Sequence, residues 1–217
     1  MERYDFRPNI YAMNQNRRLT RSIGIMVPNL ADPFFAEIAR NIPYPYTRTL
    51  ELAAQMLGPQ VQVLDLATSE EGRAIKMFRY TDPGSPDAGK RVVWVMARQH
   101  AFESHSSWYA EGLARWQLGD DPLAIELRRK AIVYVIPMMD VDNVYNGGAG
   151  KEQLAHDGGR VDFNRSWGEY PPWAAIRAAK RLLERAKKTH DIAAFIDLHN
   201  PGANERLPFF YVSADEL

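Results

Sequence analysis

Two histidines and a glutamate are spaced along the chain so that a fold could gather them on one metal ion. His100 and Glu103 form a His-x-x-Glu pair directly after an apolar run at residues 92–97, and His199 follows another apolar run at residues 192–198. Two histidines and one glutamate, with an open fourth position, are a ligand set of catalytic zinc. Zinc lowers the pKa of its bound water to about 7 and polarises a carbonyl. These residue types therefore predict a hydrolytic zinc site.

The elements that must position these residues alternate between strands and helices. Three near-continuous apolar runs are typical of strands buried on both faces: residues 92–97, 131–137 and 192–198. Two alternating runs are typical of half-buried strands: residues 61–66 and 74–80. Four segments have helical periodicity or helix-start signals: residues 46–57, 107–118, 123–130 and 172–188. We therefore predict an α/β fold, with a mostly parallel or mixed sheet and helices on both of its faces.

This architecture predicts where the chemistry lies, because ligands of open α/β sheets bind beyond the carboxyl ends of the strands. Polar residues follow each of the three apolar runs. His100 follows the first run and His199 follows the last, and the run that ends at residue 137 is followed by a long polar loop that ends in residues 162–165. Taken alone, the His-x-x-Glu pair also fits an ordinary loop, and His199 fits a hydrogen-bonded histidine of the core. Their shared position at strand ends favours the metal site.

Composition narrows the class of protein. The 217 residues include 27 Lys and Arg against 27 Asp and Glu, and the net charge is zero, so we expect no nucleic-acid partner. The absence of cysteine excludes disulfides, thiolate metal ligands and a cysteine nucleophile. Because the sequence has no leader-like apolar segment and no run of about 18 apolar residues, we expect no membrane partner and a cytoplasmic location.

The order of the motifs resembles the zinc carboxypeptidase family over about residues 41–215. The similarity rests on the segments HAFE at 100–103, DFNRSW at 162–167 and DLH at 197–199, and the segment IPYPYTR at 42–48 resembles the start of the cytosolic carboxypeptidase-like branch. The resemblance implies that zinc is the cofactor and that its ligands are His100, Glu103 and His199. It also implies a metallocarboxypeptidase that hydrolyses a C-terminal peptide bond, or releases a glutamate from a peptide branch.

The resemblance assigns further roles in the segment DFNRSW. Asn164 and Arg165 are expected to bind the terminal carboxylate of the peptide substrate, a task that suits the planar guanidinium of arginine. Asp162 is expected to accept a hydrogen bond from the far nitrogen of His100, which would fix the orientation of this ring. Arg165 could also be an ordinary surface or ion-pair arginine.

Two departures from the family pattern concern catalysis. The family has a further arginine upstream of the Asn-Arg pair. Between residues 137 and 159 this chain has no arginine and Lys151 is its only Lys or Arg, whereas Arg160 lies very close to the pair, so we leave that role open. The general base of the family is a glutamate on a later strand, whereas this chain ends at Leu217 and Glu205 is too close to His199. We therefore expect the base to be absent from the chain, the carboxypeptidase-like fold to be incomplete and the activity to be impaired.

The first 40 residues resemble a different family. Residues 7–18, 23–28 and 32–40 are similar to the hinge, first strand and first helix of the effector domain of LacI-type bacterial repressors. We predict a short βα appendage at residues 1–40, joined near residues 41–43 to a carboxypeptidase-like domain at residues 41–217. A different interpretation of the whole chain is a non-catalytic zinc-binding or carboxylate-binding module, or a vestigial repressor fusion.

Overall fold

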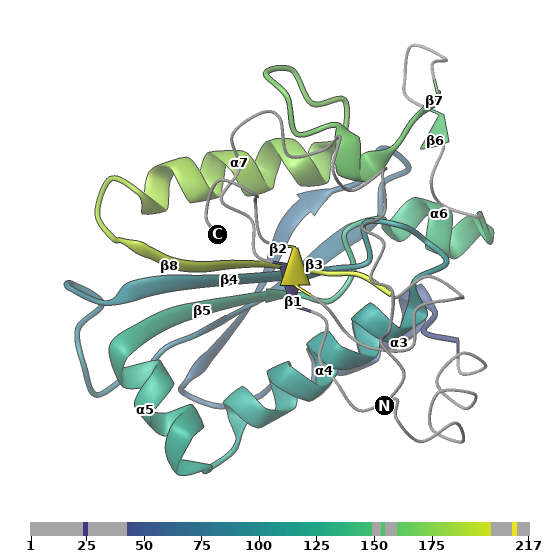
Figure 1. Cartoon of the computed structure of the whole chain (residues 1–217). Coiled ribbons are helices and arrows are strands. Elements are labelled where there is room, and N and C mark those ends of the chain that lie inside the picture. Colours follow the sequence, from purple (N-terminus) through teal and green to yellow (C-terminus); the bar gives the residue numbers. More distant parts are fainter. Residues whose placement is uncertain (1–23, 26–42, 149–152, 155–159, 201–209, 212–217) are drawn as a thin grey trace, which may run out of the picture.

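The computed structural model describes residues 24–25, 43–148, 153–154, 160–200 and 210–211 (Figure 1). Within these ranges the molecule is built around one five-stranded sheet, and two further pairs of very short strands accompany it. No helix in the described ranges is long and apolar enough to span a membrane.

The central sheet is mixed. Its strands, in spatial order, are β2 (Val61–Thr68), β3 (Ala74–Tyr80), β5 (Ala131–Ile136), β4 (Arg91–Ala97) and β8 (Ile192–Leu198). The pairs β2–β3 and β3–β5 are antiparallel, whereas β4 runs parallel to both β5 and β8. The prediction of an α/β fold with a mostly parallel or mixed sheet is confirmed. The parallel strands β4 and β8 are those that precede the predicted metal ligands.

Helices cover both faces of the sheet, as the sequence predicts. α7 (Ala174–Ala186) lies on one face, and three helices lie on the other: α3 (Tyr46–Gln55), α4 (Ser104–Leu118) and α5 (Pro122–Lys130) (Figure 1). Side chains of β4 alternate between the two layers, because successive residues of a strand point to opposite faces. Trp94 and Met96 pack in the cluster that contains Ile176 of α7, and Val95 packs in the cluster that contains Ala110 of α4.

The predicted burial of the three apolar strands is correct for two of them. β5 is buried along its whole length and β4 along most of it. β8 is present at the predicted residues, but only Leu198 is fully buried and the preceding residues are mostly half-buried. The reason is its place in the sheet: β4 is the single strand that pairs with β8 in the described part of the chain. An apolar run alone does not distinguish a central strand from an edge strand.

The polar stretch after β5 contains, among its described residues, short helical elements that the sequence does not predict. It contains α6 (Val141–Asn146), where the sequence predicts a loop, and a 3₁₀ turn, η1 (Phe163–Arg165). α6 lacks apolar periodicity and is defined by its ends: the Asp140 side chain accepts a hydrogen bond from the backbone of Asn143, and Gly147 adopts a φ of 72°. A capping side chain and a glycine in the left-handed region are typical helix boundaries.

Two short antiparallel pairs lie outside the central sheet. β6 (Gln153–Leu154) pairs with β7 (Arg160–Val161), and β1 (Gly24–Ile25) pairs with β9 (Phe210–Tyr211). β1 falls within residues 23–28, where the repressor-like segment predicts its first strand. The helix predicted within residues 32–40 and the rest of the repressor-like segment lie outside the described residues.

Candidate metal centre

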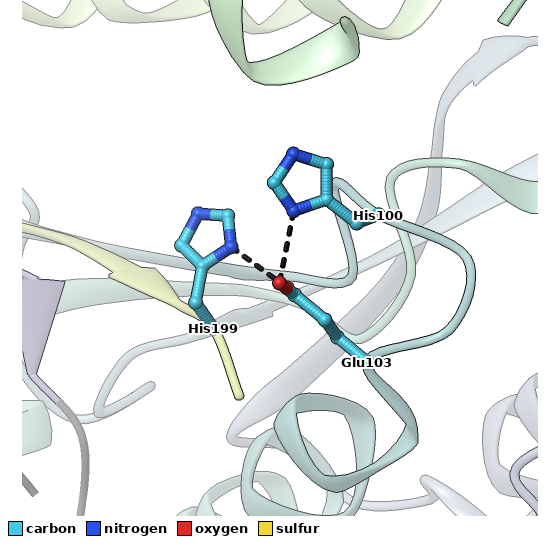
Figure 2. A group of neighbouring side chains, drawn as sticks. All are labelled: His100, Glu103 and His199. Carbon is cyan, nitrogen blue, oxygen red and sulfur yellow. Dashed lines mark hydrogen bonds and ion pairs between the residues drawn. The ribbon is translucent and has the colours of Figure 1, made fainter. Parts of the chain in front are cut away.

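Three side chains meet at the carboxyl ends of two parallel strands. His100 follows β4, Glu103 is the residue immediately before α4, and His199 follows β8 (Figure 2). Because β4 and β8 are hydrogen-bonded parallel neighbours, residues that follow them emerge at the same edge of the sheet. The possible ligand atoms of these three residues all lie within 4.8 Å of one another. The fold thus brings together the residues that the sequence suggests as metal ligands.

Glu103 lies between the two imidazole rings. Its Oε1 is 2.9 Å from Nδ1 of His100, and its Oε2 is 2.7 Å from Nδ1 of His199. Figure 2 shows both rings turned toward this carboxylate. Glu103 and His100 are each only 4% exposed. His199 is half-buried, so two nitrogens and a carboxylate face one small, partly open region. This is the arrangement that a cation with nitrogen and oxygen ligands and an open position requires.

Each ring also faces a second carboxylate with its other nitrogen. Nε2 of His100 is 3.0 Å from Oδ1 of Asp162, and Nε2 of His199 is 2.7 Å from Oδ2 of Asp197. A carboxylate at Nε2 favours the proton on that nitrogen and leaves Nδ1 free to bind a metal. Asp197 was not assigned a role from the sequence, although its place two residues before His199 at the end of a strand was a usable signal.

The charges of the site are strongly coupled. Burial raises the pKa of Glu103, but His199 and His100 outweigh this effect and lower it to about 2. Burial lowers the pKa of His199, whereas the nearby Asp197 and Glu103 carboxylates raise it well above its usual value. Positive charge beside Glu103 therefore stabilises its buried carboxylate in the negatively charged form. A divalent cation bound by neutral imidazoles supplies that charge equally well, so the donor set fits zinc.

Arg98 shapes the loop that carries His100 and Glu103. Its φ of 61° is in the left-handed region, which costs a non-glycine residue roughly 1–2 kcal/mol. Its guanidinium is buried and donates to the backbone carbonyl of Ala101 at 2.8 Å, and its backbone N–H donates to Ser106 Oγ at 3.1 Å. Burial lowers the pKa of Arg98 to about 10. Arg98 was not assigned a role from the sequence, although it directly follows β4.

The residues suggested for carboxylate binding lie beside the metal ligands. The Asp162 side chain accepts a hydrogen bond from the backbone N–H of Asn164 at 2.9 Å, which begins η1 and holds the turn against His100. The Asn164 amide nitrogen is 3.2 Å from Nε2 of His199. Arg165 is more open: its guanidinium is 3.8 Å from Asp162 Oδ2, and its side chain is 38% exposed. One turn thus presents an amide and a guanidinium next to the three ligands.

The side chains of three residues named from the sequence are not among those that the structure describes. Glu205 and Lys151 are not among the described residues, and only the backbone of Arg160 is described. The expectation that no general base is present, and the open question of the upstream cation, therefore stay as predictions.

Comparisons with a family model and with curated proteins both match this chain to carboxypeptidases. The family model described as zinc carboxypeptidase matches residues 46–185. Cytosolic carboxypeptidase 6 of Mus musculus is 26% identical over 167 residues, which cover 72% of this chain and 30% of that protein. Cytosolic carboxypeptidase 2 of Danio rerio is 28% identical over 172 residues, which cover 75% of this chain and 23% of that protein. The chain thus spans a third or less of the length of these curated relatives.

Solved structures give the same result. A metallo-carboxypeptidase from Burkholderia cenocepacia has a TM-score of 0.60 and 27% identity, over 73% of this chain and 42% of its own. A metallo-carboxypeptidase from Pseudomonas aeruginosa, in complex with (2-guanidinoethylmercapto)succinic acid, has a TM-score of 0.60 and 28% identity, over 73% of this chain and 40% of its own. The resemblance of residues 1–40 to LacI-type repressors is not borne out by the comparisons.

Proposed function

Because the chain belongs to the zinc carboxypeptidase family, we propose that it is a metallocarboxypeptidase module acting on the C-terminus of a peptide or protein. His100, Glu103 and His199 would hold one zinc ion, and their convergence within 4.8 Å is the observation that carries the proposal. Zinc in such a site polarises the scissile carbonyl and acidifies a water molecule. The remaining chemistry must come from the residues around it.

The protein residues would first bind and orient the substrate. Arg165 presents an exposed planar guanidinium suited to a terminal carboxylate, and Asn164 adds an amide beside His199. Asp162 would hold His100 through its Nε2 and place the turn that carries both anchoring residues. Binding the carboxylate at this turn would bring the last peptide bond of the substrate toward the metal ligands, which is the positional requirement of an exopeptidase.

The proton transfers of hydrolysis need a further group. Glu103 faces both imidazoles, and Asp162 and Asp197 each face one, so these carboxylates are already engaged. A general acid or base must carry a proton to the leaving nitrogen and typically contributes 10²–10⁴-fold to the rate. The arrangement of the described residues therefore supports binding more directly than turnover. This also keeps a non-catalytic zinc-binding and carboxylate-binding module as the second candidate.

We also propose that residues 41–217 carry the carboxypeptidase-like domain, separate from an N-terminal segment at residues 1–40. The start of the family match at residue 46 supports this division. A cytoplasmic location is proposed on the names of the relatives, several of which are cytosolic carboxypeptidases.

Metal analysis tests the proposed ligands. We expect about one zinc per chain, a loss of at least 100-fold in affinity in His199→Ala, and no change in His190→Ala. His190 is the matched control because its ring bonds to the backbone carbonyl of Lys90 and takes no part in the metal group. Unchanged zinc stoichiometry and affinity in His199→Ala would contradict the assignment.

Peptide binding and hydrolysis distinguish the two candidates. The zinc-loaded chain should bind a peptide with a free C-terminus more tightly than its amidated form, and Arg165→Ala should abolish the difference. Arg129→Ala is a control, since Arg129 is 67% exposed and pairs with Asp82 away from the site. Release of the last residue supports the peptidase, whereas binding without release supports the non-catalytic module.

A further inference from the structure

Gln99 joins three segments around the metal group. It lies between β4 and His100 and is fully buried. Its side-chain amide contacts Trp167 Nε1 at 2.7 Å, Asn164 Oδ1 at 2.9 Å and Asp197 Oδ2 at 2.5 Å. These partners come from the loop after η1, from η1 itself and from β8. A buried amide is costly unless it is hydrogen-bonded, and here both ends of the amide are satisfied.

The chemistry of the partners determines how the amide is oriented. An indole N–H can only donate, so the oxygen of Gln99 must face Trp167. The amino group of Gln99 then faces two acceptors, Asn164 Oδ1 and Asp197 Oδ2, and each of its hydrogens has one of them. Trp167 thus sets the orientation of Gln99, which in turn sets the orientation of the other two side chains.

The orientation of Asn164 has a consequence for ligand binding. Since its oxygen accepts from Gln99, its amino group is turned toward His199, with its nitrogen 3.2 Å from Nε2. When Nδ1 of His199 binds a metal, Nε2 carries the proton and donates it to Asp197, so it offers no lone pair to Asn164. The amino group of Asn164 then has no acceptor on His199 and is available to donate to an external acceptor such as a carboxylate.

We propose that Gln99 is a positioning residue that couples the metal ligand His199 to the carboxylate-binding turn. Through Asp197 it holds the His199 ring, and through Asn164 it fixes the orientation of the amide that is proposed to bind the substrate carboxylate. The inference rests on the proposed function, because it assigns Gln99 to the same zinc and carboxylate sites. Among the described residues, the Gln99 side chain bonds to Trp167, Asn164 and Asp197 and to none of the three proposed metal ligands or Arg165. Its proposed effect on both sites is therefore indirect.

The test is Gln99→Leu in the full chain, with Gln117→Leu as the matched control. Gln117 is equally buried and lies near the end of α4, and its side-chain amide has no hydrogen-bond partner among the described residues. We expect Gln99→Leu to weaken zinc binding about 10–100-fold, as is typical when the support of a metal-bound histidine is removed. It should also change the visible spectrum of the cobalt-substituted protein, which reports ligand geometry. Gln117→Leu should alter neither.

Trp167→Phe provides a second, milder variant in case Gln99→Leu fails to fold. It removes the donor that orients Gln99 while keeping an aromatic ring beside Phe195. We expect the zinc-loaded variant to lose at least half of the preference for a free over an amidated peptide C-terminus, with a smaller change in zinc affinity than Gln99→Leu.

The outcomes separate this inference from the proposed function. A wild-type chain that binds no zinc would overturn both. If the wild type binds zinc and the peptide, but both variants match it in zinc affinity, cobalt spectrum and peptide preference, Gln99 is only part of the core and the inference is wrong. A lower melting temperature of Gln99→Leu with these three properties unchanged would also make the inference wrong.

Discussion

Asp162 has several partners for a single carboxylate. One of its oxygens lies 3.0 Å from Nε2 of His100 and 2.9 Å from the backbone nitrogen of Asn164, and the other lies 3.8 Å from the guanidinium of Arg165. Burial raises the pKa of Asp162, but hydrogen bonding to His100 and the charges of His100 and Arg165 lower it overall. The residue therefore connects a proposed metal ligand with the proposed anchor for the substrate carboxylate.

Replacing Asp162 with asparagine tests this connection at the level of one functional group. Asp162→Asn keeps an oxygen acceptor of similar size and removes the charge, so the ring of His100 becomes a weaker ligand. We expect zinc affinity to fall about 10–100-fold, measured by competition with a chromogenic chelator. Asp65→Asn is the control, because Asp65 is 53% exposed and pairs with Lys76 across β2 and β3. Equal zinc affinity in the two variants would show that Asp162 does not support His100.

At the level of elements, α3 and α4 are joined by a buried carboxylate. Glu111 of α4 accepts from Arg48 of α3 at 2.5 and 3.1 Å and from Arg115 at 2.9 Å. The Glu111 side chain is 5% exposed, whereas that of Arg48 is 29% exposed. Since α4 begins directly after Glu103, this contact helps to fix the helix from which the proposed ligand projects.

Glu111→Gln should lower the free energy of unfolding by about 2 kcal/mol, the usual scale for hydrogen bonds to a charged group. Denaturation with urea measures the change. Glu126→Gln, which removes an exposed pair with Lys130 within α5, should have little effect. If both variants unfold at the wild-type midpoint, the link between α3 and α4 does not stabilise the protein.

The same residue predicts a dependence of stability on pH. Burial raises the pKa of Glu111, but the hydrogen bonds from Arg48 and Arg115 outweigh it and lower the pKa in the folded state. A lowered folded-state pKa adds stability that is complete above the unfolded value of about 4.3 and is lost as the pH falls through the folded value. The difference in unfolding free energy between wild type and Glu111→Gln should therefore shrink below about pH 4. A constant difference between neutral and strongly acidic pH would contradict this explanation.

For the whole molecule, the metal group links parts of the chain that are far apart in sequence. Glu103 and His199 are 96 residues apart and meet because β4 and β8 are parallel neighbours. An ion held by both would bind only the folded chain and so stabilise the fold as a unit. Stability should then depend on zinc concentration in the manner of a ligand linked to folding.

Thermal unfolding measures this linkage. Free zinc at about 100 times its Kd should add about 2.7 kcal/mol, which corresponds to an increase in Tm of roughly 5–10 °C for a domain of this size. A chelator should reverse the increase, magnesium at the same concentration should not reproduce it, and His199→Ala should not respond. An equal increase in His199→Ala would place the zinc elsewhere in the molecule.

Local patterns in the sequence were sufficient to predict most elements and to suggest His100, Glu103 and His199 as metal ligands, whereas the roles of Asp162, Asn164 and Arg165 followed from the family resemblance. The apolar runs before His100 and His199 predicted β4 and β8 because strands covered by helices must be apolar, and polar residues that follow such strands lie at the ligand-binding edge. Helix signals predicted α3, α4, α5 and α7 within a few residues. α6 was missed, since a six-residue helix defined by its end residues has no periodicity to detect.

The tertiary structure alone decided the order and direction of the strands and the network around the ligands. The sequence did not show that β8 has β4 as its single partner strand in the described sheet, because burial depends on neighbours rather than on a strand's own residues. Nor did it show that Gln99 meets Trp167, Asn164 and Asp197, or that Asp197 faces His199. Residue types predict which groups can bind a metal, since ligand chemistry is local. The hydrogen bonds around the ligands join segments up to 98 residues apart, and they form only when the packed sheet places those segments together.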